Sequence, residues 1–208
     1  MAKRTLAAHC RALAQCRLCG YGDEIVPIVS HARSPLAMLV GQAPGQVEAA
    51  GGEPFAGRAG KTLFRWLERA GIDESTARDR IYIAAITRCY PGPHPGGRGD
   101  RVPSPGEQET CSVWLDDELR IIQPRLLIPV GKLAILRFMP ARPLGELIGR
   151  AHEIEHVGGR SLAIPLPHPS GASSWIHQGD HPQLLDRALA LIGAELAKLG
   201  IVKARSVA

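Results

Sequence analysis

Four short apolar segments, each bounded by residues that favour turns, constrain the fold of this chain most strongly. They span residues 37–40, 81–86, 126–130 and 162–166. Each has the length and composition of a strand buried in a parallel sheet. Apolar residues at helical spacing follow at 61–70, 107–122 and 183–199. This alternation predicts an α/β fold, a three-layer α/β/α sandwich around a central, mostly parallel four-stranded sheet.

Composition narrows the class of protein. The chain has 208 residues, 45% hydrophobic and 22% charged, a globular balance that predicts a single domain over residues 1–208. Apolar runs long enough to span a membrane are missing, and the basic N-terminus has no apolar core with a cleavage site, so we expect a cytoplasmic protein without membrane contact. The net charge of +5 permits an anionic partner but does not by itself identify one.

Two motifs follow predicted strands at the edge where α/β sheets bind ligands. Residues 41–45 read GQAPG after the first strand, and residues 168–171 read HPSG after the fourth. Glycines allow a ligand to approach the backbone, and a histidine at a strand end can donate a hydrogen bond to a developing anion. Either motif alone is also typical of an ordinary turn.

The spacing of the cysteines favours a metal site. Cys16 and Cys19 form a C-x-x-C pair, and Cys89 and Cys111 could complete a set of four ligands. A chain without a secretion signal is not expected to carry a disulfide framework. On spacing alone, zinc and an iron–sulfur cluster both remain open, and Cys10 is interpreted as a buried, inert residue.

Five motifs in order, GQAPG, EPFAGRAG, YIAAITRCYPG, CSVWL and HPSG, resemble the uracil-DNA glycosylase superfamily, specifically its iron–sulfur family 4 and family 5 types. The resemblance runs from about Cys16 to the last predicted helix. It implies that Cys16, Cys19, Cys89 and Cys111 hold a structural [4Fe-4S] cluster in preference to zinc. It also implies DNA with an extruded deaminated base as the partner, with no obligate protein partner.

The resemblance assigns roles to the strand-end residues. Hydrolysis of an N-glycosidic bond releases the base as an anion, which the site must stabilise. His168 would face the O2 side of the base, Gln42 would help to position the attacking water, and Phe55 would stack on the base. The other expected substrate-binding residues are Gly41, Ala43, Pro44, Gly45, Ala85 and Ser170.

Two departures from the family patterns bear on mechanism and specificity. Gln42 replaces the acid of the family 4 GEAPG motif, and Ala43 stands where family 1 has an aspartate, so Glu48 becomes the candidate catalytic carboxylate. Ala85 replaces a base-reading asparagine, as in family 5. This predicts that hypoxanthine or xanthine is released as well as uracil.

Further residues are expected to contact DNA. Arg98 and Arg101, in the Pro/Gly-rich segment 90–105, would bind phosphates, and Trp175 and Ile176 would wedge into the gap left by a flipped base. Because no lysine nucleophile is recognised, the enzyme is expected to be monofunctional. Two alternatives remain: a catalytically weak iron–sulfur protein that binds damaged or single-stranded DNA, and a zinc-bound, phosphatase-like hydrolase.

Overall fold

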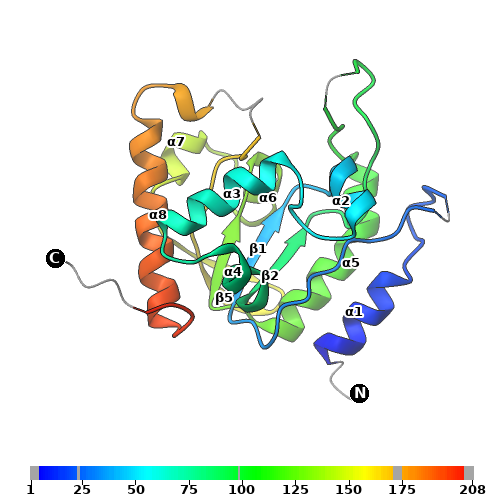
Figure 1. Ribbon diagram of the computed structural model, residues 1–208, viewed down its shortest axis with the longest axis horizontal. Coiled ribbons are helices and arrows are strands. Elements are labelled where there is room, and N and C mark those ends of the chain that lie inside the picture. The colour runs from blue at the N-terminus through cyan, green and yellow to red at the C-terminus, as the bar shows by residue number, and fades with distance from the viewer. Residues whose placement is uncertain (1–4, 23, 98, 171–174, 204–208) are drawn as a thin grey trace.

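The computed structural model describes residues 5–22, 24–97, 99–170 and 175–203, and its centre is a five-stranded sheet (Figure 1). The strands are β1 (Ala37–Gly41), β2 (Ile81–Ala85), β3 (Leu126–Pro129), β4 (His152–His156) and β5 (Gly159–Ala163). Their order is β2-β1-β3-β5-β4, and only the β4–β5 pair is antiparallel among these strands. The predicted α/β class is confirmed, but the prediction of four strands was wrong.

The missed strand is β4, at the edge of the sheet. Its sequence, HEIEH, contains a single buried residue, Ile154. An edge strand with polar side chains does not produce the continuous apolar run expected of a strand buried on both faces. The fourth predicted strand also begins earlier than expected, at Gly159, because β4 and β5 form a hairpin before β5 pairs with β3.

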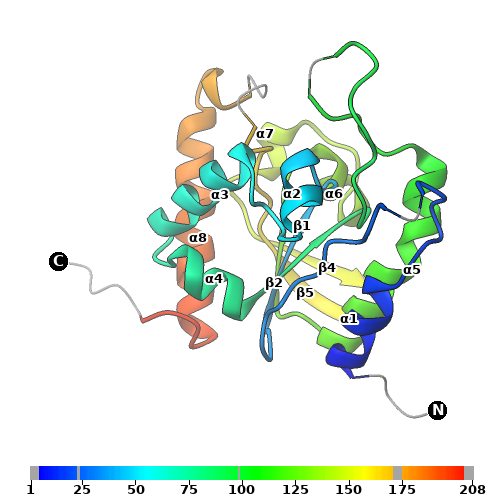
Figure 2. The same ribbon diagram turned by 45° about the vertical axis from the view of Figure 1, so that its right-hand side comes forward.

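Helices cover both faces of the sheet. Figure 2 shows α3, α4 and α8 on one side and α1 and α5 on the other. The three predicted helices are α3 (Arg58–Arg69), α5 (Pro105–Ile122) and α8 (His181–Lys198). The others are α1 (Leu6–Ala14), α2 (Gln46–Gly51), α4 (Glu74–Arg80), α6 (Lys132–Phe138), α7 (Leu144–Leu147) and the 3₁₀ turn η1 (Trp175–His177).

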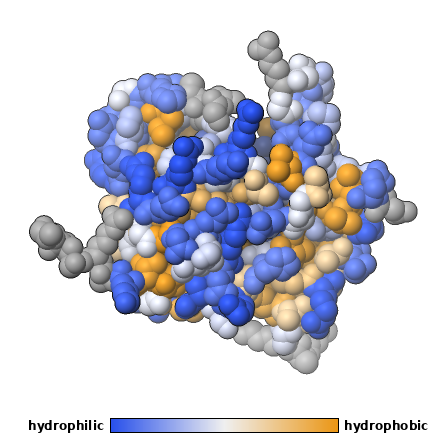
Figure 3. Space-filling model, viewed as in Figure 1, coloured by the Kyte–Doolittle hydropathy of each residue, from blue (hydrophilic) through white to orange (hydrophobic). Residues whose placement is uncertain are grey.

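The apolar core lies between these layers. Every residue of β1 and β3 is buried, and the core extends to the inner faces of α3, α5 and α8. Figure 3 shows hydrophilic residues over much of the visible face, with apolar residues scattered among them. Across the described ranges, no helix is both long enough and apolar enough to cross a membrane.

A charged network is buried between α1, β2 and α5. Arg88 forms an ion pair with Glu118, and their side chains are 2% and 0% exposed. The Tyr82 hydroxyl donates to the same carboxylate at 2.7 Å, and His9 Nε2 lies 3.4 Å from it. A buried ion pair is strongly destabilising when one partner is removed, because the other charge remains without compensation.

We therefore expect Glu118→Gln to lower the free energy of unfolding by about 3–5 kcal/mol, since it leaves the Arg88 guanidinium buried and unneutralised. Asp117→Asn is the matched control on the same helix, because Asp117 forms an exposed ion pair with Arg120 at 3.1 Å. It should cost about 0.5 kcal/mol or less. Urea unfolding of both variants checks this, and equal losses of stability would contradict it.

Candidate active site

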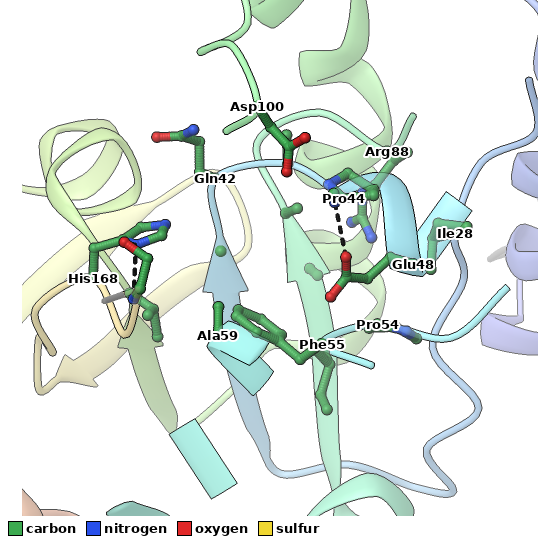
Figure 4. Close-up of a pocket in the computed structure, with 18 of the residues that line it drawn as sticks. Ile28, Gln42, Pro44, Glu48, Pro54, Phe55, Ala59, Arg88, Asp100 and His168 are labelled. Carbon is green, nitrogen blue, oxygen red and sulfur yellow. Dashed lines mark hydrogen bonds between the residues drawn. The ribbon is translucent and has the colours of Figure 1, made fainter. Parts of the chain in front are cut away.

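The carboxyl ends of the parallel strands surround a pocket of about 340 Å³ (Figure 4). The sheet register pairs Gly41 with Ala85, so the GQAPG segment and the end of β2 lie side by side. The expected site residues that line the pocket are Gly41, Gln42, Ala43, Pro44, Gly45, Glu48, Phe55, Ala85, Arg101, His168 and Ser170. Tertiary structure thus brings together segments that are more than a hundred residues apart in the chain.

The Glu48 carboxylate fastens two backbone segments of the pocket. One oxygen accepts a hydrogen bond from the Gly45 amide at 3.0 Å, and the other accepts one from the Gly57 amide at 2.9 Å. The residue is 9% exposed. Both oxygens are therefore engaged in holding the GQAPG segment against the segment that carries Phe55.

Phe55 lies across the pocket wall because two glycines leave room for it and an arginine supports its backbone. A Cβ on Gly41 would lie 2.9 Å from the Phe55 ring, and one on Gly60 would lie 1.7 Å from its carbonyl oxygen. The φ angle of Phe55 is +54°, which is rare for a residue with a side chain and requires support from its surroundings. Arg78 supplies part of it by donating to the Pro54 carbonyl at 2.8 Å.

His168 presents a neutral ring with its proton on the pocket side. Its Nδ1 accepts a hydrogen bond from the Ser170 amide at 3.2 Å and lies 2.9 Å from the Ser170 hydroxyl. Because a backbone amide can only donate, Nδ1 is unprotonated and the proton resides on Nε2. Burial lowers the pKa of His168, which keeps the ring neutral. Gly131 permits this position, since a Cβ there would lie 2.9 Å from the imidazole.

All four cysteines of the predicted ligand set line a second cavity, of about 230 Å³. Burial raises the pKa of the Cys89 thiol to about 12 and that of the Cys111 thiol to about 11. Trp114 Nε1 donates to the Cys16 sulfur at 3.1 Å. Within the described residues, no group of three or more His, Cys, Asp and Glu side chains is arranged to hold a single metal ion.

Cys10 lies outside this cavity. It is partly buried, and its sulfur is 3.7 Å from the Tyr82 hydroxyl. Arg88, in contrast, lines both the cysteine cavity and the active-site pocket. The two cavities therefore share a wall, and the buried guanidinium of Arg88 forms part of that wall.

The segment 90–105 folds back on itself beside the pocket. The His94 amide donates to the Gly99 carbonyl at 2.9 Å, and Arg101 binds Glu107 through two hydrogen bonds of 2.7 and 2.5 Å. Arg101 is thus already engaged by a carboxylate, and its expected phosphate contact stays a prediction. Arg98 lies outside the described residues.

Trp175 and Ile176, the residues predicted to wedge into DNA, pack against the folded protein. The Trp175 ring stacks on His181 with centroids 4.0 Å apart, and His181 Nδ1 is 2.8 Å from the Trp175 carbonyl oxygen. Trp175 and Ile176 are partly buried and pack against the core. Their proposed insertion into DNA stays a prediction. Gly171, the last residue of the HPSG motif, is not among the described residues.

Three residues that support the site were given no role from the sequence: Arg78, Arg88 and Glu107. Arg78 and Arg88 act through contacts between distant segments, for which the sequence carries no local signal. Glu107 does have a local sequence signal, because Ser104-x-x-Glu107 is a capping-box pattern. The structure shows both reciprocal hydrogen bonds of this capping box.

Comparison with known proteins places this geometry in a family. The model of the Uracil DNA glycosylase superfamily matches residues 30–195. A Type-4 uracil-DNA glycosylase of Thermotoga maritima is 32% identical over 133 residues, which are 64% of this chain and 64% of that protein. One from Archaeoglobus fulgidus is 29% identical over 168 residues, 77% of this chain and 79% of that protein.

A Type-5 uracil-DNA glycosylase of Mycobacterium bovis is 33% identical over 115 residues, 49% of this chain and 40% of that protein. The alignment thus covers just under two thirds of the Thermotoga relative and less than half of the mycobacterial one. The family model, in contrast, covers well over half of this chain and includes every residue that lines the pocket except Ile28. The chain belongs to the uracil DNA glycosylase superfamily.

Proposed function

We propose that this protein hydrolyses the N-glycosidic bond of uracil, and of at least one deaminated purine, in DNA. The observation that carries the proposal is the His168 ring, which is held neutral and whose Nε2–H has no hydrogen-bond partner among the described residues, in a pocket that Phe55 also lines. A donor fixed in advance toward a developing anion stabilises the transition state more than the ground state. Type-4 relatives named for uracil release support the same activity.

The residues of the pocket divide the work of such a reaction. The base would stack on the Phe55 ring, and His168 Nε2–H would bind the oxygen on which negative charge accumulates. The amides of the GQAPG segment, fixed by Glu48, would hold the base edge and the water. No lysine lines the pocket in the described part of the chain, which supports a monofunctional glycosylase.

We further propose that Cys16, Cys19, Cys89 and Cys111 hold a [4Fe-4S] cluster. Support comes from the four sulfurs lining one cavity and from the tryptophan N–H directed at Cys16. The cluster would supply structural linkage between the N-terminal segment, the end of β2 and α5.

The first experiment is a single-turnover uracil-release assay on single- and double-stranded DNA. Wild-type protein should release uracil, and His168→Ala should slow release by roughly 10²- to 10³-fold with nearly unchanged DNA affinity, because one transition-state donor is lost. His31→Ala, an exposed histidine, is the control. Binding without release by the wild type would instead support a catalytically weak DNA-binding protein.

The second experiment concerns the base. Ala85 has no side-chain donor or acceptor, and a site that does not hydrogen-bond an edge discriminates poorly against analogues. Wild-type protein should therefore release hypoxanthine or xanthine as well as uracil. Ala85→Asn should shift the ratio of rates toward uracil by about tenfold or more. Release of uracil alone by the wild type would remove Ala85 from the explanation of specificity.

The third experiment concerns the cysteines. Protein purified without oxygen should contain iron and inorganic sulfide, and Cys89→Ser should lose both together with folded yield. Cys10→Ser is the matched control because Cys10 lies outside the cavity, and its iron content should equal that of the wild type. Stoichiometric zinc without iron in the wild type would overturn the cluster assignment.

A further inference from the structure

The pocket needs a carboxylate that the GQAPG segment does not supply. Cleavage of the glycosidic bond leaves positive charge on the sugar and requires a proton to leave the attacking water. Neither Gln42 nor Ala43 carries a negative charge. Among the described residues that line the pocket, the acids are Glu48 and Asp100.

Glu48 is poorly placed to accept a proton from the attacking water. Each of its oxygens already accepts a backbone N–H, from Gly45 and from Gly57. Accepting a proton from water would weaken the hydrogen bonds that hold these two segments together. Glu48 is better described as a positioning residue, in place of the catalytic role expected from sequence.

Asp100 is more accessible than Glu48, although its carboxylate also accepts a hydrogen bond from the Tyr90 hydroxyl. Its Oδ2 would lie 2.8 Å from a Cβ at position 45, so a glycine there leaves space for the carboxylate beside the GQAPG segment. Figure 4 shows Asp100 directed into the pocket from the loop side, whereas His168 enters from another wall. The residue is exposed and therefore reachable by water.

The position of Asp100 is fixed by its neighbours in the loop. The Arg101 amide donates to the Gly92 carbonyl at 3.1 Å, and the Arg101 guanidinium is bound by Glu107 on α5. The guanidinium also lies 5.9 Å from the centre of the Tyr21 ring, two residues after Cys19. The loop is thus attached to α5 and to the cysteine segment immediately next to Asp100.

We propose that Asp100 is the catalytic carboxylate of this pocket. Arg101, which Glu107 holds in place, is the residue that positions Asp100. This proposal rests on the proposed glycosylase function. As the bond between C1′ and the base nitrogen breaks, its electron pair leaves with the base, which His168 Nε2–H stabilises. The water oxygen bonds to C1′, one of its two protons passes to the Asp100 carboxylate, and the other stays on the new hydroxyl group.

Asp100→Asn tests the catalytic role because it keeps size and removes the charge. Single-turnover uracil release should fall by roughly 10²- to 10⁴-fold, and Asp100→Glu should recover part of the loss. Affinity for DNA carrying a 2′-fluorinated deoxyuridine, which resists cleavage, should stay within about twofold of the wild type. Glu109→Gln removes an exposed charge elsewhere and should leave the rate unchanged.

A double-mutant cycle tests the positioning role. Arg101→Met should slow the wild-type reaction but have little further effect in the Asp100→Asn background, because both changes act through one carboxylate. Equal slowing in both backgrounds, with weaker DNA binding and a smaller salt dependence, would show a phosphate contact and overturn the positioning role.

The outcomes separate the two proposals. An active wild type whose Asp100→Asn variant releases uracil at the same rate overturns the role of Asp100 and leaves the glycosylase function standing. A wild type that binds DNA but releases no base overturns both.

Discussion

The buried ion pair between Arg88 and Glu118 is the constraint on which both cavities depend. Arg88 follows β2 and directly precedes Cys89, while Glu118 lies on α5 two turns after Cys111. Because neither charge can reach water, each residue must remain beside the other, which fixes α5 against the end of β2. The same guanidinium lines the cysteine cavity and the pocket, so the packing of one cavity sets a wall of the other.

Close backbone approach shapes the rest of the pocket. Phe55 can cross the end of β1 only because Gly41 has no side chain, and its carbonyl fits only against Gly60. The positive φ of Phe55 is maintained by interactions from outside the segment, from Arg78 and from the Glu48 bridge to Gly57. The stacking surface of the site is therefore held by charged residues that would not themselves touch a base.

Much of the fold and part of the site could be predicted from sequence. Continuous apolar runs located β1, β2 and β3, since burial on both faces leaves an unmistakable pattern, whereas β4 at the edge leaves none. The strand-end rule correctly brought the GQAPG and HPSG segments to one pocket. It could not distinguish the two acids, because a carboxylate engaged by two amides and one facing the pocket look alike in sequence.

The sequence by itself determined the layered α/β class, the edge of the sheet that carries the pocket, and the set of cysteines that come together. These follow from periodicity and from short motifs, which are local properties of the chain. Only the tertiary structure decided that Glu48 ties backbone segments together, that Arg101 is held by Glu107, and that Asp100 faces the pocket. The physical reason is that the role of a charged side chain depends on which groups lie within hydrogen-bond distance of it in the folded protein. Those groups come from other segments of the chain.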